Sequence, residues 1–211
     1  MSGSSTESEM MKGEEVHLND EEIVTLDEMI EKGESWCLAE DVVTKSVAVV
    51  AKQEGLDKNE VSLSLTALAG TLKNLTKGPL EITDDHHRRK WDGYFVKRCP
   101  SPLTNLGYFV QAAVGAKGAA AGVLYTGRNR RGDPCGWLLA WSDSKANGLR
   151  IYARCGLEAK FKNLDWDNDI KPKLDVAGSS VNVHDNETGT SVIGKIVGSS
   201  GKDLLVAAFA G

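Results

Sequence analysis

One short stretch of the sequence, residues 86–95 (HHRRKWDGYF), gathers basic and aromatic side chains. Guanidinium and ammonium groups beside aromatic rings can hold phosphate head groups, a nucleic-acid backbone or the ring of a sugar. The charged turn at residues 127–134 can extend such a surface. The alternative interpretation is a strand end with solvated charges and core aromatic rings. On the binding interpretation, the candidate ligand-binding residues are His87, Arg88, Arg89, Lys90, Trp91, Tyr94, Arg128 and Arg130.

No known catalytic motif fits the sequence. The run Gly198-Ser-Ser-Gly201-Lys202 suggests a phosphate-binding loop, but the first glycine of that motif would fall at Ile196 and its Ser/Thr position is Asp203. A hairpin turn is the better interpretation. The sequence has no G-x-S-x-G elbow and no cysteine with a histidine near it in sequence. We therefore predict that the protein is not an enzyme, and we expect no catalytic residues and no cofactor.

Two segments resemble metal sites only superficially. Asp165-Trp-Asp167-Asn-Asp169 looks like the start of a calcium loop, but the sixth position is Ile170 and the twelfth is Val176. An EF-hand needs Gly and Glu there. His86 and His87 are adjacent, so on a strand they point to opposite faces and cannot easily share a metal. No metal site is predicted.

Charge is distributed unevenly along the 211 residues, whose formal net charge is −5. Residues 1–41 hold 13 acidic and 2 basic side chains, and residues 42–211 hold 17 acidic and 23 basic ones. A body this mildly basic disfavours nucleic acid as a partner. A further hypothesis is that the acidic segment folds back on the basic body and masks its binding face.

Membrane-spanning and secreted classes are disfavoured. No apolar run reaches the roughly 18–20 residues that a membrane-spanning helix needs, so no transmembrane segment is expected. The N-terminus lacks the basic and apolar regions of a secretory signal. We expect a cytoplasmic protein, with the nucleus as an alternative, in which the cysteines are free thiols. The cysteines are Cys37, Cys99, Cys135 and Cys155.

The N-terminal part divides into a leader and a helical segment. Residues 1–18 have no apolar period and are predicted to be a disordered acidic leader. Residues 19–58 are predicted to hold one or two helices. The first would begin at the N-cap Asn19 and end at Gly33, and the second would end at Gly55.

The remaining residues, 59–211, read as a β-sandwich domain of about eight short strands separated by glycine-rich turns. Gly70 and Gly78 are expected to cut the early strand-like pieces. Residues 107–114 and 119–126 are expected to pair as a hairpin, and Asn147-Gly148 is a strong turn signal. The predicted fold class is therefore mainly β, a sandwich preceded by N-terminal helices. The core and near-core positions are predicted to be Val123, Trp137, Leu139, Trp141, Ile151 and Tyr152.

Several short motifs occur in an order that resembles a known family. They are His87, Trp91-Asp-Gly93, the run 121–129, Gly132-Asp133, the block Trp137-Leu-Leu-Ala-Trp-Ser142, Tyr152 and Asp165-Trp166. In these residues the chain resembles the plant 23 kDa jasmonate-induced protein family, over roughly residues 60–175 and into the terminal strands. The acidic N-terminal third departs from the family.

The resemblance implies a soluble plant protein whose abundance rises with jasmonate, wounding or osmotic stress, and it implies a sandwich of the actinoporin type. It implies no activity. We therefore expect a non-enzymatic, defence-associated binding module. The alternatives are a lipid-head-group-binding or pore-forming protein and a lectin-like glycan binder, so anionic lipid head groups and glycans are the candidate partners. Jasmonate itself is not expected to be the ligand, because induction by a hormone does not require affinity for it.

Overall fold

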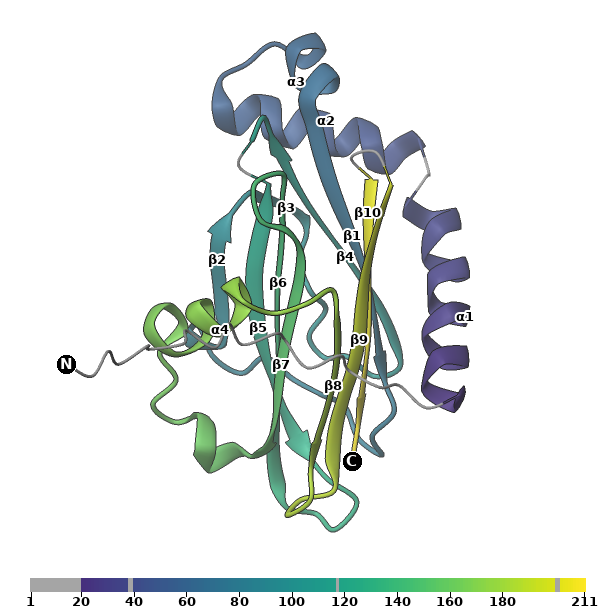
Figure 1. Ribbon diagram of the computed structural model, residues 1–211, viewed down its shortest axis with the longest axis vertical. Coiled ribbons are helices and arrows are strands. Elements are labelled where there is room, and N and C mark those ends of the chain that lie inside the picture. The colour runs from purple at the N-terminus through teal and green to yellow at the C-terminus, as the bar shows by residue number, and fades with distance from the viewer. Residues whose placement is uncertain (1–19, 38–39, 117, 200–201) are drawn as a thin grey trace, which may run out of the picture.

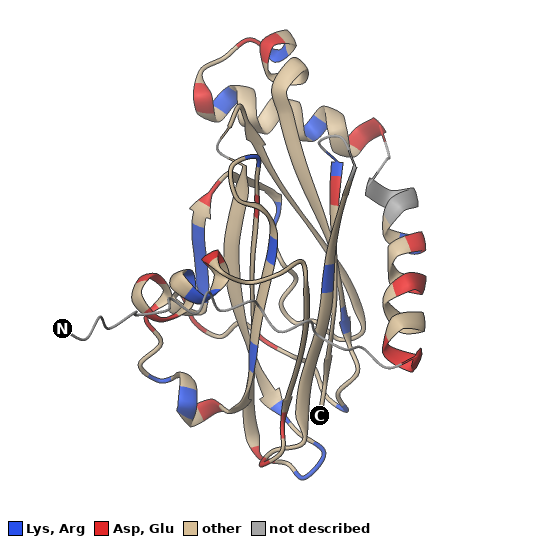
Figure 2. Ribbon diagram, in the orientation of Figure 1, with Lys and Arg blue, Asp and Glu red and all other residues tan. Residues whose placement is uncertain are grey.

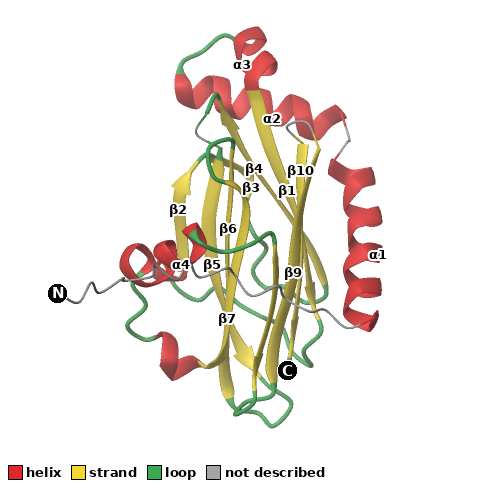
Figure 3. Ribbon diagram, in the orientation of Figure 1, coloured by secondary structure: helices red, strands yellow, loops and turns green. Residues whose placement is uncertain are grey.

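The computed structural model describes residues 20–37, 40–116, 118–199 and 202–211, and the predicted leader lies outside these ranges. Two β-sheets face each other as a sandwich, with helices along one side and at one end (Figures 1 and 3). The strands of the described residues are β1 (Leu65–Asn74), β2 (Arg88–Asp92), β3 (Tyr94–Lys97), β4 (Leu106–Val114), β5 (Ala119–Arg128), β6 (Pro134–Ser144), β7 (Gly148–Leu157), β8 (Ser180–Asp185), β9 (Thr190–Ser199) and β10 (Lys202–Ala210).

The large sheet has the strand order β3-β4-β1-β10-β9-β8, and the small sheet has the order β2-β5-β6-β7. β1 and β10 run parallel, and the other strand pairs are antiparallel. This arrangement confirms the prediction of a mainly β fold behind N-terminal helices. The helices and helical turns are α1 (Asp20–Cys37), α2 (Glu40–Glu54), α3 (Lys58–Ser64), η1 (Asp85–His87), η2 (Glu158–Phe161), η3 (Trp166–Ile170) and α4 (Lys171–Asp175).

The main core lies between the two sheets. β6 contributes Trp137, Leu139 and Trp141, and each of these side chains is fully buried. The indole N–H groups are satisfied, since Trp137 donates to the carbonyl of Ala210 at 2.9 Å and Trp141 donates to Oε1 of Gln111 at 2.8 Å. Burial of side chains this large contributes at least about 1.5–3 kcal/mol each. The core prediction is confirmed for five of its six residues, whereas Tyr152 is half-buried on the outer face of the small sheet.

Helical segments cover the outer faces of both sheets. α1 lies along the large sheet through Leu26 and Met29, and the segment from η2 to α4 covers the small sheet. The predicted helix end at Gly33 is wrong, because α1 continues to Cys37. A Cβ at Gly33 would lie 2.9 Å from Cδ1 of Leu204, so glycine here permits close approach of helix and sheet.

The predicted hairpin of residues 107–114 and 119–126 is also wrong. β4 lies in the large sheet between β1 and β3, and β5 lies in the small sheet between β2 and β6. Gly115 and Gly118 adopt φ values of +74° and +77°, which let the chain cross from one sheet to the other. Pairing of β4 with β1 and β3, and of β5 with β2 and β6, therefore overrides the local hairpin pattern.

Gly70 does not cut a strand, because β1 runs through it from Leu65 to Asn74. The ring of Phe109 lies over this glycine, which explains why no side chain is present there. Leu63 belongs to α3, which ends directly before β1. Gly55 ends α2 with a φ of +68°, and the Asn147-Gly148 turn joins β6 to β7, as predicted. Within the described residues, no helix combines the length and apolar character needed to cross a bilayer.

Candidate functional site

The basic and aromatic segment spans both sheets along one side of the sandwich. β2 is an edge strand of the small sheet, β3 is an edge strand of the large sheet, and Gly93 joins them with a φ of +73°. Figure 2 shows the basic residues of β2 as a blue band on this edge. Because side chains alternate along a strand, the segment presents two different faces.

Arg89 and Trp91 point to the outer face of the small sheet. Both bind Asp167, which precedes α4: the Arg89 guanidinium forms an ion pair with it, and Nε1 of Trp91 donates to Oδ1 at 2.8 Å. These two hydrogen bonds hold the pKa of Asp167 below its ordinary value. Trp91 also meets Trp166 edge-on, with ring centroids 6.1 Å apart. These two candidate residues therefore fasten β2 to the helical cover.

Arg88 points inward, between the sheets. Its Nε is buried and has no hydrogen-bond partner among the described residues. The guanidinium lies near Cys99 and Tyr125, and its charge favours their ionised forms. Desolvation is the larger effect, and it raises the pKa of Cys99 to about 12. The Cys99 side chain is therefore a neutral thiol, and no carboxylate of the described residues forms an ion pair with Arg88.

Lys90 and Tyr94 interact with each other near the turn at Gly93. Nζ of Lys90 lies 4.9 Å from the ring centroid of Tyr94, within cation–π range. The Tyr94 hydroxyl donates to Oε1 of Glu54, at the end of α2, at 2.8 Å. This hydrogen bond raises the pKa of Tyr94. Tyr94 thus ties the edge of the large sheet to the helical end of the molecule.

A cavity of about 270 Å³ opens beside Arg88. We call it the edge cavity. Its lining includes Asp85 and the basic residues of β2, together with apolar residues of β3, β5 and β6 and with Arg98 and Cys99, which follow β3. The residues that matter for its chemistry are Asp85, Arg88, Phe95, Arg98, Val123 and Trp141.

The edge cavity combines an apolar floor with cationic walls. Trp141 and Val123 are core residues of the small sheet, and Phe95 meets Trp141 edge-on at 6.5 Å between centroids. Such a lining, mostly apolar with a few polar groups, is typical of ligand sites. Arg88 and Arg98 would favour an anion. The chemistry of this lining is therefore that of binding an anionic group together with a small uncharged body.

Sequence reasoning missed part of this cavity. Arg98 follows β3 directly. The sequence feature that could have identified it as a site residue is the continuation of the basic pattern past Phe95. Trp141 was predicted only as a core residue, and nothing in its neighbourhood along the chain links it to Arg88. Asp85 has no sequence signal for a site beyond its place three residues before Arg88.

His87 belongs to a different hollow. It borders a cavity that also includes His86, Asp84 and Glu158, on the other side of the η1 turn. Its Nδ1 lies 3.3 Å from Oγ1 of Thr83. In the ranges that the structure describes, no three His, Cys, Asp or Glu side chains are grouped to hold a metal.

Arg128 and Arg130 lie away from the edge cavity. Val123 pairs with Arg88, so Arg128 is five residues further along β5, which corresponds to about 17 Å of strand. Its guanidinium donates to the carbonyl of Gly132 at 2.6 Å. Arg130 borders a separate hollow beside the turn that joins β8 to β9. The structure therefore does not bring the turn at residues 127–134 together with β2 into one site.

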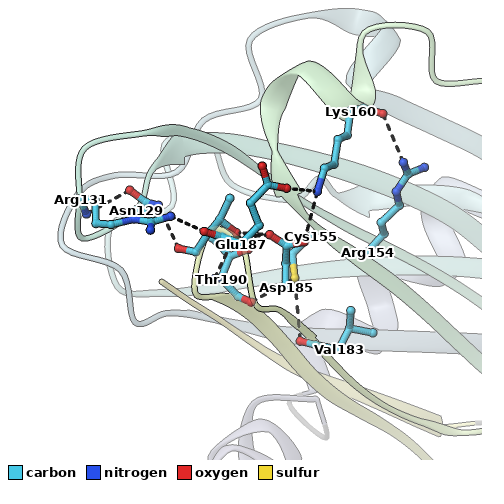
Figure 4. Close-up of polar contacts among 10 residues, drawn as sticks. Asn129, Arg131, Arg154, Cys155, Lys160, Val183, Asp185, Glu187 and Thr190 are labelled. Carbon is cyan, nitrogen blue, oxygen red and sulfur yellow. Dashed lines mark hydrogen bonds and ion pairs between the residues drawn. The ribbon is translucent and has the colours of Figure 1, made fainter.

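The turn at residues 127–134 instead takes part in a polar cluster, shown in Figure 4. Nδ2 of Asn129 donates to the carbonyl of Thr188 at 2.9 Å, and Arg131 donates to the carbonyl of Glu187. Nζ of Lys160 bridges Asp185, at 3.3 Å, and Glu187, at 2.8 Å. Hydrogen bonds from Thr188, more than the Lys160 ammonium, keep the pKa of Asp185 low. The cluster joins the turns of the two sheets.

Comparison with known proteins places this geometry in context. No protein-family model matches the chain. Over 147 residues the chain is 31% identical to a protein named jasmonate-induced protein homolog, from Atriplex canescens, and the match covers 64% of this chain and 75% of that protein. The crystal structure of the lipid binding protein Nakanori shares the fold, with a TM-score of 0.54 and 12% identity over 82% of this chain and 80% of that one.

Proposed function

The chain belongs to the jasmonate-induced protein family, and from this membership we propose that it is a stress-responsive binding protein and not an enzyme. Its proposed ligand is the anionic head group of a lipid, held in the edge cavity. The relative's name describes induction by a hormone and states no ligand. The proposal for the ligand is therefore based on the cavity.

Arg88 is the observation that carries the proposal. A guanidinium placed between two sheets loses hydration, and its Nε gains no hydrogen bond in the described structure. A buried donor that lacks a hydrogen-bond partner costs free energy. A phosphate or carboxylate entering the edge cavity would supply that partner through charge-assisted hydrogen bonds. The unliganded protein thus holds a cation in a position that favours an anion.

The size and mouth of the edge cavity support a head group as the bound part. At about 270 Å³ it is smaller than the roughly 300–1,000 Å³ typical of sites for drug-sized ligands. A whole lipid would not fit, whereas a head group would. Arg98 and Lys90 are exposed at the cavity, and basic groups near an anionic membrane surface contribute about 1 kcal/mol each. Nakanori, which shares the fold, is named a lipid binding protein.

Glycan stacking is less favoured by the same contacts. Trp91 is held by Asp167 and meets Trp166 edge-on, and Tyr94 is engaged by Lys90 and Glu54. Lys90 lies over the Tyr94 ring and Nζ of Lys171 lies 6.0 Å from the ring centroid of Trp91, so a cation already contacts each ring where a sugar would stack. Pore formation is also less favoured, because α1 carries Asp and Glu in its first turn. Moving an Asp to bilayer depth costs about 2.5–3.5 kcal/mol even on the most permissive scale.

An enzymatic role has little support in the edge cavity. The nucleophilic candidate there is Cys99, and desolvation raises its pKa to about 12. The thiolate is the reactive form of cysteine, so a thiol with this pKa is a poor nucleophile near neutral pH.

Vesicle co-sedimentation tests the proposed function. The full chain is mixed with vesicles of a neutral lipid alone or with added anionic lipid, across a salt series. We expect binding only to the anionic vesicles, weakening as salt rises. Arg88→Gln should reduce binding by roughly tenfold or more, and the matched control Arg130→Gln, with the same charge change at an exposed position outside the cavity, should leave it nearly unchanged. Equal loss in both variants would contradict a specific site.

A further inference from the structure

We propose that the head group held in the edge cavity is a phosphorylated polyol, with its phosphate between Arg88 and Arg98 and a hydroxyl group on Asp85. This inference rests on the proposed function and narrows its ligand. It depends on three features of the described residues: two guanidinium groups, one carboxylate in the same lining, and an apolar floor of limited size.

The two arginines favour phosphate over a simple carboxylate. A guanidinium presents a planar set of donors that matches the oxygens of a phosphate, and phosphate has enough oxygens to engage two guanidinium groups from different sides. Arg88 lies at the inner end with an unpartnered Nε, and Arg98 lies at the exposed end, just after β3. Neither residue forms a salt bridge with another described residue.

Asp85 adds a requirement for a hydrogen-bond donor. An ionised carboxylate only accepts hydrogen bonds, so it repels phosphate oxygens and attracts a hydroxyl or an ammonium group. The lining nevertheless carries more cationic than anionic side chains, since Arg88, Lys90 and Arg98 accompany Asp85, whereas the Arg89 guanidinium is paired with Asp167 on the outer face. This excess disfavours a cationic head group such as phosphocholine. A phosphate with neighbouring hydroxyl groups satisfies both the arginines and Asp85.

The η1 turn holds Asp85 and Arg88 in a fixed relation. The backbone N–H of Arg88 donates to the carbonyl of Asp85, and the side chain of Asp84 caps the turn by accepting from the N–H of His86 at 2.8 Å. Nε1 of Trp166 donates to the carbonyl of His86 at 2.6 Å. The acceptor and the inner cation are therefore presented by one anchored turn, so little ordering is needed on binding.

The floor suits the uncharged part of such a head group. Phe95 is half-buried and offers an apolar surface on which the C–H face of a polyol ring can rest, and the buried side chains of Val123 and Trp141 support it from behind. The cavity volume of about 270 Å³ leaves the acyl chains outside. Head groups of this class occur on membrane lipids and as free phosphate esters, and the experiment separates these two sources.

Isothermal titration calorimetry on the full chain tests the inference, with four soluble probes: inositol 1-phosphate, inositol, inorganic phosphate and phosphocholine. We expect inositol 1-phosphate to bind more tightly than inorganic phosphate and phosphocholine, and inositol to show no binding. Arg88→Gln should weaken binding of inositol 1-phosphate by roughly tenfold or more. The control Arg130→Gln should bind as the unaltered chain does.

Asp85→Asn is the decisive variant. An amide no longer repels phosphate, so inorganic phosphate should bind the variant more tightly. The amide is also a weaker acceptor for a hydroxyl, so the difference in affinity between inositol 1-phosphate and inorganic phosphate, which we call the gap, should narrow. If the unaltered chain binds the two probes equally, or if Asp85→Asn leaves the gap unchanged, the inference is overturned. Circular dichroism of each variant checks that the fold is retained.

A vesicle arm separates failure of this inference from failure of the proposed function. Vesicles containing phosphatidylinositol are compared with vesicles of equal charge containing phosphatidylserine. Preference for phosphatidylinositol that depends on Arg88 supports the inference with lipid as the source, and binding of inositol 1-phosphate without vesicle binding supports it with a free ester as the source. Equal, Arg88-dependent binding to both vesicles would keep the proposed function and overturn the polyol preference. Binding to no anionic vesicle would overturn the lipid function alone.

Discussion

The carboxyl groups of Asp143, on β6, and Asp203, on β10, are neighbours between the two sheets, close enough for a protonated Asp143 to donate a hydrogen bond to Asp203. Both residues are buried, with 6% and 7% of their surfaces exposed. Burial, and then the hydrogen bond to Asp203 and repulsion by its charge, raise the pKa of Asp143 to about 8. Two carboxyl groups this close cannot both ionise without cost.

This pair predicts a loss of stability toward alkaline pH. The folded state keeps a proton on Asp143 up to about pH 8, whereas an unfolded aspartate releases it near pH 4. The contribution to stability is therefore complete below about pH 4 and is lost as the pH rises to about 8. We expect the free energy of unfolding in urea to fall by on the order of a few kcal/mol across this window.

Asp143→Asn tests the assignment, because an amide can donate the same hydrogen bond at every pH. This variant should flatten the decline between pH 5 and pH 8. Asp27→Asn, at an exposed position on α1, is the control and should keep the slope of the unaltered chain. An unchanged slope in Asp143→Asn would show that other groups cause the decline.

Arg88 predicts a conflict between stability and binding. Arg88 is half-buried, and its Nε is buried without a hydrogen-bond partner among the described residues, so an apolar side chain of similar length at this position removes a desolvation cost. Arg88→Met should therefore raise the melting temperature of the unliganded chain by about 2–4 °C, the shift that about 1 kcal/mol produces in a protein of this size. The same variant should lose binding to anionic vesicles. A lower melting temperature would mean that Arg88 contributes to folding through a contact of its own.

Asp167 predicts that the helical cover keeps β2 in position. Asp167→Ala removes the acceptor shared by Arg89 and Trp91. We expect faster amide hydrogen exchange along β2, with little change in β9 on the far sheet. Because hydrogen bonds lower the pKa of Asp167, its contribution is present above about pH 4 and is lost as the pH falls below that value. We compare protection factors of the β2 amides at pH 7 and pH 3. In the unaltered chain they should be lower at pH 3, and in the variant this difference should be smaller.

The two faces of β2 show which part of the candidate site can be predicted from the sequence. Alternation along a strand separates Arg88 from Arg89, and this follows from the sequence once a strand is predicted. Which of the two faces the core depends on Asp167 and Trp166, which lie more than seventy residues away and bind the outer face. The local pattern therefore identifies β2 as a candidate strand but does not show which of its residues faces the interior.

The edge cavity could not be predicted as a unit for a similar reason. Phe95, Val123 and Trp141 come from three strands in two sheets. The hairpin pattern of residues 107–114 and 119–126 predicted that both segments pair within one sheet, whereas they lie in different sheets. Turn signals act over a few residues, but strand pairing is decided over the whole chain. The core positions on β6 were predictable, because they follow from the alternation of side chains and from the large aromatic residues, whichever strands pair with β6.

Gly70 packs against the aromatic core next to the edge cavity. A Cβ at Gly70 would lie 1.8 Å from Cε1 of Phe109, whose ring meets Trp141 at 4.6 Å between centroids. Gly70→Ala should therefore reduce the free energy of unfolding by about 3 kcal/mol, the upper end for overpacking. Gly78→Ala, where a Cβ meets no atom within 4 Å, should change it by less than about 0.5 kcal/mol. Urea unfolding of Gly70→Ala, Phe109→Leu and the double variant tests the cause. If the added methyl group clashes with the Phe109 ring, the smaller leucine side chain at that position relieves the clash, and the double variant should lose less free energy of unfolding than the sum of the two single losses. Additive losses would place the defect in the backbone of β1 and not in the ring of Phe109.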